Sequence, residues 1–280
     1  MTSQVMAPLT CRSYGAVMTL APPDTSAGTM LRHWRERRRL SQLDLSNRAA
    51  VSTRHLSYVE TGRSRPSREL LLHLAEMLDV PLREQNRMLL AAGHAPHFSE
   101  RPVDAPELAD VRRALDQVLE AHDPWPAVLV DGHWDVVGMN AGAWLFADGV
   151  DPVLLEPPIN VIRLSLHPAG LARRIVNLAD FARHLVVRLQ RQFDTTADPR
   201  LGALLDEVEP WVPSGAGGHG ASPGVVLPVV LASPLGELRL FSTISTFGAP
   251  LDATLSELAL EAFYPSDAVS ADRIRRLASP

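Results

Sequence analysis

The stretch AAVSTRHLSYVETGRSRP, residues 49–66, gathers hydrogen-bonding side chains around a short predicted helix. Ser52 is a typical helix N-cap and Gly62 a typical helix end, so the helix should lie between them. Leu56 and Val59 are three residues apart and should face a core. The polar side chains left on the other faces are those of Thr53, Arg54, Ser57 and Tyr58. When the N-terminal end of such a helix enters the major groove of DNA, these groups can bond to base edges.

Three arginines and a glutamine extend this candidate surface. Arg54 can hold O6 and N7 of one guanine together, which gives about 1–3 kcal/mol of base discrimination. Arg63 and Arg65 follow the helix and are placed for phosphates, which fix register without selecting sequence. Gln42 opens the preceding predicted helix, where backbone N–H groups and its amide can also hold phosphate. The candidate DNA-contacting residues are therefore Gln42, Ser52, Thr53, Arg54, Ser57, Tyr58, Arg63 and Arg65.

The charge distribution supports nucleic-acid binding by one part of the chain. The net charge of the 280 residues is −5, which argues against such binding when the chain is taken as a whole. Residues 30–92, however, hold 12 Arg against 7 acidic residues, whereas the remainder holds 15 Arg against 25. Such asymmetry is typical of a basic binding module joined to an acidic domain. Two alternatives remain: the arginines form a solvated face that binds nothing, or the module binds a protein.

Five short helices are predicted around this stretch, because serine caps and glycine or proline boundaries separate runs with apolar residues at helical spacing. They cover roughly residues 29–39, 42–49, 53–61, 67–78 and 81–92. Five helices with tight turns make a compact all-α domain. The residues before it contain Pro22 and Pro23 and show no sustained period, and Met30 offers an alternative start of translation. After it, Pro96 and Pro102 indicate a linker.

The rest of the chain is predicted to mix helices and strands. A helix over roughly 106–121 precedes WPAVLVDGHWDVVGMN, in which Asp131-Gly132 is the favoured type I′ hairpin turn between two strands. A helix-like segment begins at Asn140, and a long amphipathic helix is expected from Pro168 to Phe193.

The C-terminal part is predicted to add two paired strands around residues 234–236. The first of them contains Pro228 and should therefore lie at a sheet edge or bulge. Residues 213–223 should form a flexible loop, and SELALEAF (256–263) a helix. The predicted division is a disordered tail at 1–28, a helical domain at 29–93, a linker at 94–105, an α+β domain at 106–266 and a C-terminal tail at 267–280.

The segment LRHWRERRRLSQLDLSNRAAVSTRHLSYVETGRSRPS resembles the Cro/C1-type helix-turn-helix family, also called XRE for xenobiotic response element. The matching motifs are Ser41-Gln42, Ala50-Val51-Ser52 and Glu60-Thr61-Gly62-Arg63. The resemblance implies a lambda-repressor-like fold that binds double-stranded DNA, with Arg35 of the first helix paired with Glu60. Ala50 stands where the family usually has Gly. If the turn needs a left-handed residue there, the strain is on the order of 1 kcal/mol.

Residues 106–266 resemble the PAS-like ligand-binding domain of MmyB-like XRE regulators. The landmarks are Trp134, Asn140, Asn160-Val161-Ile162-Arg163, His167-Pro168 and the FSTISTFG strand. The resemblance implies a pocket for fatty-acid-like or other apolar molecules. The apolar candidates for its lining, each of which can equally be ordinary core, are Trp134, Trp144, Phe146, Ile162, Leu164, Phe181, Leu185, Phe241 and Phe247. Arg163 could meet a ligand carboxylate, or it could form a structural ion pair.

Several kinds of chemistry find no support in the sequence. No stretch reaches the ~20 apolar residues of a membrane span. The single cysteine, Cys11, excludes a disulfide within the chain and suits a reducing cytoplasm. His94 and His97 form H-x-x-H, but no second cluster has metal-ligand spacing, so both should be packing or linker residues. No phosphate-binding glycine loop or nucleophile elbow is present, so no cofactor, metal or catalytic residue is expected.

These patterns predict a cytoplasmic, sequence-specific regulator of transcription that binds palindromic DNA as a homodimer. We expect its α+β domain to sense an apolar, fatty-acid-like small molecule. An alternative is a DNA-bound scaffold whose α+β domain binds a protein and no small molecule. A third interpretation is an enzyme joined to a DNA anchor, which no feature of the sequence supports.

Overall fold

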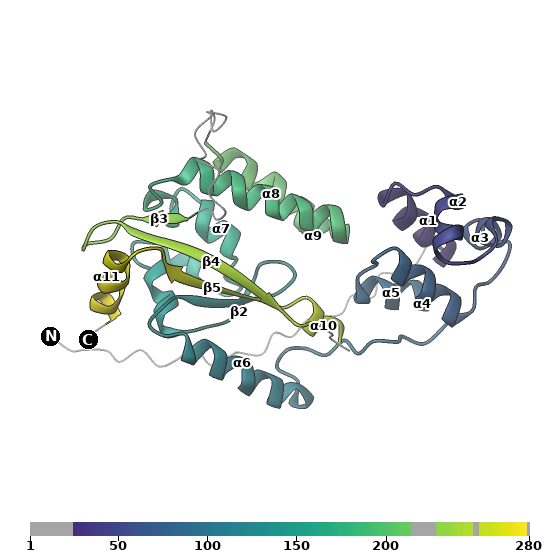
Figure 1. Cartoon of the computed structure of the whole chain (residues 1–280), viewed down its shortest axis with the longest axis horizontal. Helices are drawn as coiled ribbons and strands as arrows, with labels where there is room; N and C mark the ends of the chain where they lie inside the picture. Colours follow the sequence, from purple (N-terminus) through teal and green to yellow (C-terminus); the bar gives the residue numbers. More distant parts are fainter. Residues whose placement is uncertain (1–24, 214–227, 249–251, 279–280) are drawn as a thin grey trace. The chain divides into compact units, whose positions relative to one another are not determined.

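The computed structural model describes residues 25–213, 228–248 and 252–278 (Figure 1). The chain divides into two compact units. The helical unit comprises the described residues up to Pro102 together with Gly248–Ser256. The α+β unit comprises Val103–Phe247 together with the described residues from Glu257 onward. An all-α domain followed by an α+β domain is therefore confirmed.

Five helices build the helical unit, as predicted. They are α1 (Ala27–Arg37), α2 (Gln42–Arg48), α3 (Thr53–Glu60), α4 (Arg68–Met77) and α5 (Leu82–Ala91). The first four each begin after a serine whose side chain accepts a hydrogen bond from a backbone N–H of the first turn. Their apolar faces meet in a core that includes the fully buried side chains of Leu31, Leu45, Leu56, Leu71, Leu74 and Met88.

Helix α1 begins at Ala27, two residues before the expected domain boundary at 29. Ser26 caps it, and its hydroxyl accepts from the backbone N of Thr29 at 3.2 Å. Gly28 is buried where α1 meets α3, and an added Cβ there would overlap the carbonyl oxygen of Val59. Because only glycine allows this approach, Gly28 belongs to the core rather than to a tail.

The turn between α2 and α3 contains the left-handed residue that the resemblance implied. Ala50 has a φ of +53°. The backbone N of Val51 donates to the carbonyl of Ser46 at 3.0 Å, which closes the end of α2 as in a Schellman motif. An alanine Cβ in this conformation costs about 1 kcal/mol, so the turn is strained where glycine would not be.

Residues 94–102, expected to be a linker, are folded against α5. Asn86 of α5 is buried and accepts from the backbone N–H groups of His97 and Phe98 at 2.9 and 3.0 Å. Its amide donates to the carbonyl of Phe98 and to Oε1 of Glu100 at 2.8 and 2.7 Å. The local sequence could not show this, because the side chain that holds the segment comes from a different element.

A five-stranded antiparallel sheet forms the centre of the α+β unit, in the order β2-β1-β5-β4-β3. The strands are β1 (Ala127–Val130), β2 (Val136–Met139), β3 (Val229–Leu231), β4 (Leu238–Thr246) and β5 (Ala259–Pro265). The α-helices of this unit are α6 (Ala109–Ala121), α7 (Val161–Leu166), α8 (Leu178–Thr196), α9 (Pro199–Val208) and α11 (Ala268–Ala278). Short 3-10 helices lie at Pro106–Leu108, Ala141–Phe146, Pro152–Leu155, Leu171–Arg173 and Glu209–Trp211. β3 lies at the edge of the sheet, as predicted, but Pro228 precedes this strand instead of lying within it.

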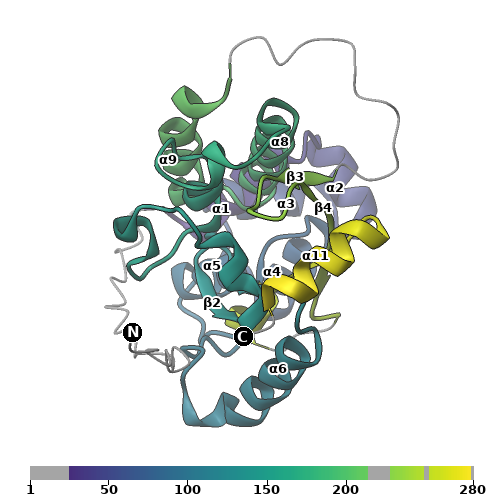
Figure 2. The same ribbon diagram turned by 90° about the vertical axis from the view of Figure 1, so that its left-hand side faces the viewer.

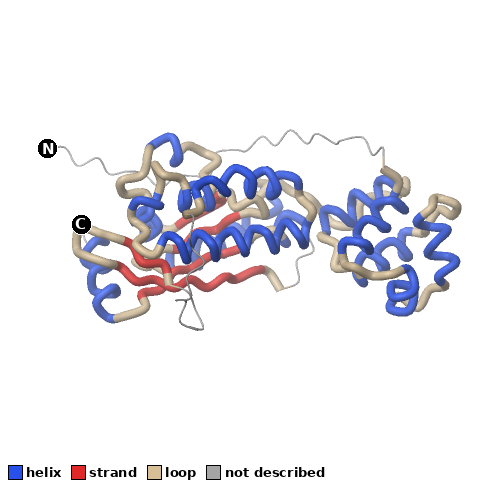
Figure 3. The backbone as a smooth tube through the Cα atoms, turned by 90° about the horizontal axis from the view of Figure 1, so that it is seen from above, coloured by secondary structure: helices blue, strands red, loops and turns tan. Residues whose placement is uncertain are grey.

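Helices lie on both sides of this sheet. Figure 2 shows α8 and α9 on one side and α6 on the other, and Figure 3 shows helices (blue) passing over the strands (red). Gly138 of β2 lies against Leu119 of α6. Ile274 of α11 is buried in the same core cluster as Leu238 and Leu240 of β4. The face of the sheet that packs against α7 and α8 lines an apolar interior, whereas the second half of β4 is largely exposed.

The segment that joins β4 and β5 completes the helical unit. Gly248–Ser256, which carries the short helix α10 (Ala253–Ser256), groups with the helical unit, and α10 contacts α5. Asp252 forms a parallel bridge with Ser99, whose carbonyl accepts from the backbone N of Ala253 at 2.8 Å. The chain between β4 and β5 thus contributes residues 252–256 to the helical unit.

Two predictions for the α+β unit were wrong. Residues 256–263, expected to form a helix, lie mostly in β5, which pairs with both β1 and β4. Hydrogen bonds to two neighbouring strands override the local helix preference. Residues 267–280, expected to be a tail, contain α11, whose apolar face is held by the buried Ile274.

The hairpin between β1 and β2 is confirmed, but its turn is not of type I′. The loop covers residues 131–135, and the left-handed residue is Trp134, with φ +69°, instead of Gly132. Oδ1 of Asp131 accepts from the backbone N–H groups of His133 and Asp135 at 2.8 and 3.0 Å. The side chain of Asp131 therefore organises a longer loop.

Other expected elements appear with shifted limits. The helix expected from Pro168 is α8, which begins only at Leu178. The helix-like segment after Asn140 is a 3-10 helix, and the Asn140 side chain caps it by accepting from Ala143 N at 3.1 Å. Residues 214–223 of the expected loop, and Cys11, lie outside the described residues.

Replacing Ala50 by glycine should raise the free energy of unfolding by up to about 1 kcal/mol, because glycine adopts the left-handed conformation without a Cβ clash. Chemical denaturation followed by circular dichroism checks this. The control Ala114→Gly, at an exposed position inside α6, should instead lower the free energy of unfolding by about 1 kcal/mol. A loss at Ala50 equal to the loss in the control would contradict the account of strain.

Candidate functional site

A buried ion pair fixes helix α3 within the helical unit. Glu60 of α3 is only 4% exposed and accepts from Nε and Nη2 of Arg35 at 2.7 and 2.9 Å. Arg35 also donates from Nη1 to the carbonyl of Leu40 at 2.8 Å, and Nε2 of Gln42 donates to Glu60 at 2.8 Å. The pair that the resemblance implied between Arg35 and Glu60 is therefore present, and it joins α1, α2 and α3.

The N-terminal turn of α3 presents polar side chains to solvent. Ser52 caps the helix by accepting from the backbone N of His55 at 3.1 Å. Arg54 is exposed, donates to the Tyr58 hydroxyl at 3.0 Å and lies over the Tyr58 ring at 5.4 Å from its centroid. This stacking holds the guanidinium along the helix. His55 is also exposed in this turn and was not among the predicted residues. The cap at Ser52 could have indicated His55, because the cap places residues 53–55 together in the first turn.

The remaining candidate residues of this surface differ in the hydrogen bonds that they already make. Thr53 is half-buried, and its hydroxyl is hydrogen-bonded to the Ser46 hydroxyl at 2.8 Å. The carbonyl of Ser57 accepts from Thr61 Oγ1 at 2.7 Å. The amide of Gln42 belongs to the network around Glu60. These residues therefore shape the surface, whereas Arg54 and His55 project from it.

The two arginines after α3 have different surroundings. Arg65 donates from Nε and Nη2 to the carbonyl of Ala92 at 2.9 and 2.7 Å, so its guanidinium closes the end of α5. Arg63 is exposed, and within the described part of the chain it has no hydrogen bond or ion pair. Arg63 is therefore the freer of the two for a phosphate.

An apolar cavity of about 60 Å³ lies in the α+β unit, between the sheet and helices α7 and α8. The structure brings six of the predicted apolar residues to its wall: Trp134, Phe146, Ile162, Leu164, Phe181 and Leu185. The other three do not line it. Trp144 and Phe247 are 38% and 37% exposed, and Phe241 stacks on Tyr264 with ring centroids 5.3 Å apart. Arg163 also lies outside the wall and forms a bidentate pair with Glu207 at 2.7 and 2.8 Å.

One charged residue of the cavity wall, Glu261 of β5, was missed by the sequence analysis. It is 7% exposed, and its Oε1 accepts from Ser242 Oγ at 2.8 Å and from Arg188 Nη1 at 3.1 Å. Glu261 was missed because residues 256–263 were predicted to be a helix. The alternation of Ala259, Glu261 and Phe263 on one face of a strand was the available signal.

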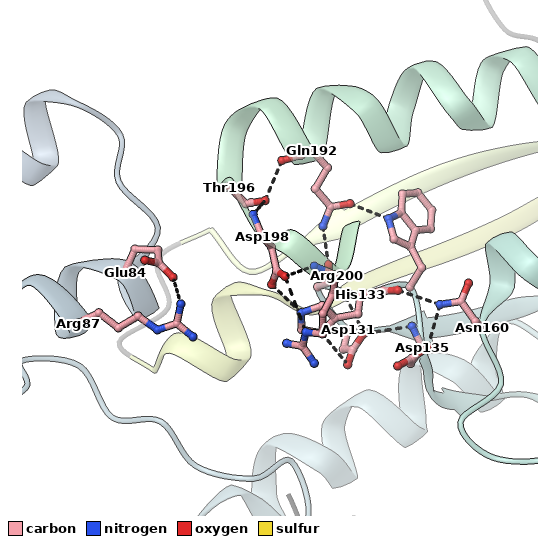
Figure 4. Close-up of polar contacts among 12 residues, drawn as sticks. Glu84, Arg87, Asp131, His133, Asp135, Asn160, Gln192, Thr196, Asp198 and Arg200 are labelled. Atoms are coloured by element: carbon pink, nitrogen blue, oxygen red, sulfur yellow. Dashed lines mark hydrogen bonds and ion pairs between the residues drawn. The ribbon is translucent and has the colours of Figure 1, made fainter. Parts of the chain in front are cut away.

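A polar cluster around Asp131, His133, Gln192 and Asp198 anchors the β1–β2 loop (Figure 4). Nε1 of Trp134 donates to Gln192 of α8 at 2.6 Å, and the Gln192 amide donates to the Gly132 carbonyl at 2.7 Å. Nε2 of His133 lies 2.8 Å from Oδ2 of Asp198, between α8 and α9. These contacts hold the Trp134 ring at the cavity wall, so we regard the cluster as structural.

No metal site accompanies these features in the ranges that the structure describes, where no group of three His, Cys, Asp or Glu side chains is arranged to hold an ion. The two histidines of the H-x-x-H motif are engaged separately. Nε2 of His94 lies 3.0 Å from the carbonyl of Pro66, and Nδ1 of His97 lies 2.7 Å from Nη2 of Arg68. The arrangement agrees with packing residues.

The polar cluster predicts a loss of stability in alkali. Burial disfavours the charged ring of His133, but hydrogen bonds to Asp131 and Asp198 outweigh burial and raise its pKa to about 9. Since the unfolded residue has a pKa of about 6.5, this stabilisation is complete below that pH and is lost as pH rises through 9. Denaturation between pH 7 and 10 should show a fall in the free energy of unfolding on the order of 2 kcal/mol.

The variant His133→Gln should lose this dependence, which separates His133 from other groups that titrate in alkali. An equal fall in the variant would show that another group is responsible. The pair of His133 and Asp198 also affects the free energy of unfolding in acid. Hydrogen bonding to His133 outweighs burial and lowers the pKa of Asp198 to about 2, so its contribution is lost only as pH falls toward that value.

Comparison with protein families agrees with both units. Residues 26–88 match the model of a helix-turn-helix domain, and residues 111–277 match the model of the MmyB-like transcription regulator ligand binding domain. A search of curated proteins found no match. No helix in the described ranges is long and apolar enough to cross a membrane. Because the second match spans more than half of the 280 residues, the chain belongs to the family of MmyB-like transcription regulators, with a helix-turn-helix domain before the ligand-binding domain.

Proposed function

We propose that this protein is a sequence-specific transcription regulator that binds double-stranded DNA as a homodimer and responds to an apolar small molecule. Helix α3 contacts the bases, and the cavity of the α+β unit takes the ligand. The observation that carries the proposal is the connection between the units. Strands β4 and β5 belong to the sheet beside the cavity, and residues 252–256 of the chain between them pack in the helical unit.

The DNA-binding part of the proposal rests on the exposed face of α3. Arg54 and His55 project from its first turn, and Arg63 is exposed just after it. The buried pair of Arg35 and Glu60 holds α3 against two other helices, so these side chains are presented by a rigid element. In a homodimer, two such helices about one DNA turn apart contact the half-sites of a palindrome.

The sensing part of the proposal rests on the apolar cavity and on its small volume. The cavity measures about 60 Å³, whereas pockets for drug-sized molecules hold roughly 300–1,000 Å³. A fatty-acid-like chain, the class that the family resemblance implies, must therefore widen the cavity as it binds. A ligand shifts an equilibrium only through different affinities for two states, and a cavity that is nearly closed without ligand supplies such a difference. The order of hairpin and Asn-capped helix supports a PAS-like domain.

Residues 252–256, in the chain between β4 and β5, connect the sheet to the helical unit. Oδ1 of Asp252 accepts from the backbone N of Thr254 at 2.9 Å, which starts α10. The residue Asp252 is 4% exposed, and its Oδ2 lies 3.6 Å from Nη1 of Arg101. The backbone N of Ala253 donates to the Ser99 carbonyl. We propose that a ligand that displaces β4 or β5 acts on the helical unit through residues 252–256, which lie in the chain between these strands.

Selection of bound sites from random double-stranded DNA tests the proposed function. The expected product is a palindrome with half-sites about 10 base pairs apart, centre to centre. Failure to enrich any sequence would contradict specific DNA binding. Native mass spectrometry of the purified protein tests sensing. A co-purified lipid-sized mass supports it, and a ligand-free protein that captures a protein partner instead favours the scaffold alternative.

Arg54→Ala and Arg63→Ala should weaken DNA binding in different ways. Arg54→Ala should relax base preference at one position, since a bidentate contact to a base gives about 1–3 kcal/mol of discrimination. Arg63→Ala should weaken all sequences alike and reduce the salt dependence by about one phosphate contact. Binding titrations at several salt concentrations distinguish the two. Arg65→Ala is the matched control: it should lower thermal stability and leave the salt dependence unchanged.

Asp252→Ala should uncouple the two units. 1-Decanol and decanoic acid serve as probes of the cavity. Any probe that changes the DNA affinity of the wild-type protein should leave that of Asp252→Ala unchanged, although the probe still binds. Asp267→Ala, which removes the Ser270 hydrogen bond at the start of α11, is the control and should respond as wild type does. A full response in Asp252→Ala would exclude this segment as the link.

A further inference from the structure

The cavity wall has few polar groups, and its charged group is an acid. Among the described residues that line the cavity, Glu261 is the one charged side chain and Ser165 the other polar one. The arginine nearest to this carboxylate, Arg188, does not line the cavity. Its guanidinium lies over the ring of Trp134, 4.3 Å from the centroid. A bound molecule therefore meets an acidic group inside an apolar wall, and not a basic one.

One oxygen of Glu261 is left for a ligand. Both hydrogen bonds of this carboxylate, from Ser242 and Arg188, end on Oε1. Within the described part of the chain, no donor reaches Oε2. Glu261 is 7% exposed, and its Oε2 is not one of the fully buried atoms. A ligand that donates to Oε2 therefore adds a hydrogen bond without displacing Ser242 or Arg188 from Oε1.

We infer that the ligand carries a hydroxyl group that donates a hydrogen bond to Oε2 of Glu261, and that its head group is not a carboxylate. This inference rests on the proposed function, because it names the head group of the molecule that the function requires. It retains the apolar chain of the fatty-acid-like expectation and replaces the acid by an alcohol.

Charge decides among three possible head groups. A carboxylate would face Glu261 at close range in an apolar surrounding, where like charges repel strongly. An ammonium group would lose its hydration in an apolar wall for a carboxylate that Arg188 already contacts at 3.1 Å. Burial and the nearby Arg188 lower the pKa of His184, which favours its neutral form. A hydroxyl donates to the carboxylate without adding charge, and a hydrogen bond to an ionised acceptor is among the strong ones.

The test compares three probes with the same chain: 1-decanol, decanoic acid and decylamine. Calorimetric titration of the full-length protein at pH 8 should show 1-decanol binding at least tenfold more tightly than decanoic acid. Glu261→Gln should weaken 1-decanol roughly tenfold and should strengthen decanoic acid, so that the preference disappears. Glu237→Gln is the matched control, because Glu237 is an exposed carboxylate paired with Arg239 in the same unit. It should preserve the wild-type preference.

Each outcome separates the inference from the proposed function. Decanoic acid or decylamine binding as tightly as 1-decanol to the wild-type protein would overturn the inference and leave ligand sensing intact. Binding of none of the three probes, together with no co-purified mass, would overturn ligand sensing and the inference with it. If Glu261→Gln does not fold, the order of affinities in the wild-type protein decides the question alone.

Discussion

Strand β5 is hydrogen-bonded to β1 along one edge and to β4 along the other, which places it at the centre of the sheet. The pairing sets the register that turns Glu261 and Phe263 toward the cavity. After the strand, the chain enters α11, which packs against β4. Before it lie residues 252–256, which pack in the helical unit. A strand held on both edges does not shift alone, so a change at the cavity is shared with β1 and β4.

The buried pair of Arg35 and Glu60 has a comparable role in the helical unit. Removing one partner of such a pair typically costs about 3–5 kcal/mol, because the other charge is left buried and unpaired. Here the Leu40 carbonyl and the Gln42 amide satisfy further donors and acceptors of the pair. The consequence is that α1, α2 and α3 are held in one arrangement, and that the first turn of α3 is fixed while the side chains of Arg54 and His55 remain exposed.

The candidate site shows where prediction from sequence succeeds and where it fails. The cap at Ser52, the left-handed Ala50 and the pairing of Arg35 with Glu60 were predicted and are present. Arg63 and Arg65 look alike in the sequence, but the carbonyl of Ala92 engages Arg65 and leaves Arg63 free. Such a contact joins residues far apart in the chain, so neither composition nor spacing contains it. The same holds for the pairing of Arg163 with Glu207.

The sequence by itself determined the five helices of the helical unit, the β1–β2 hairpin and the edge position of β3. These features depend on caps, on apolar spacing and on proline, which act within a few residues. Only the tertiary structure decided that 259–265 is a strand, that 94–102 and 252–256 pack on the helical unit, and that Glu261 enters the cavity. Helix preferences differ by at most about 0.7 kcal/mol per ordinary residue. Hydrogen bonds to β1 and β4 on both edges, with burial between them, exceed that preference and come from residues that the local sequence does not include.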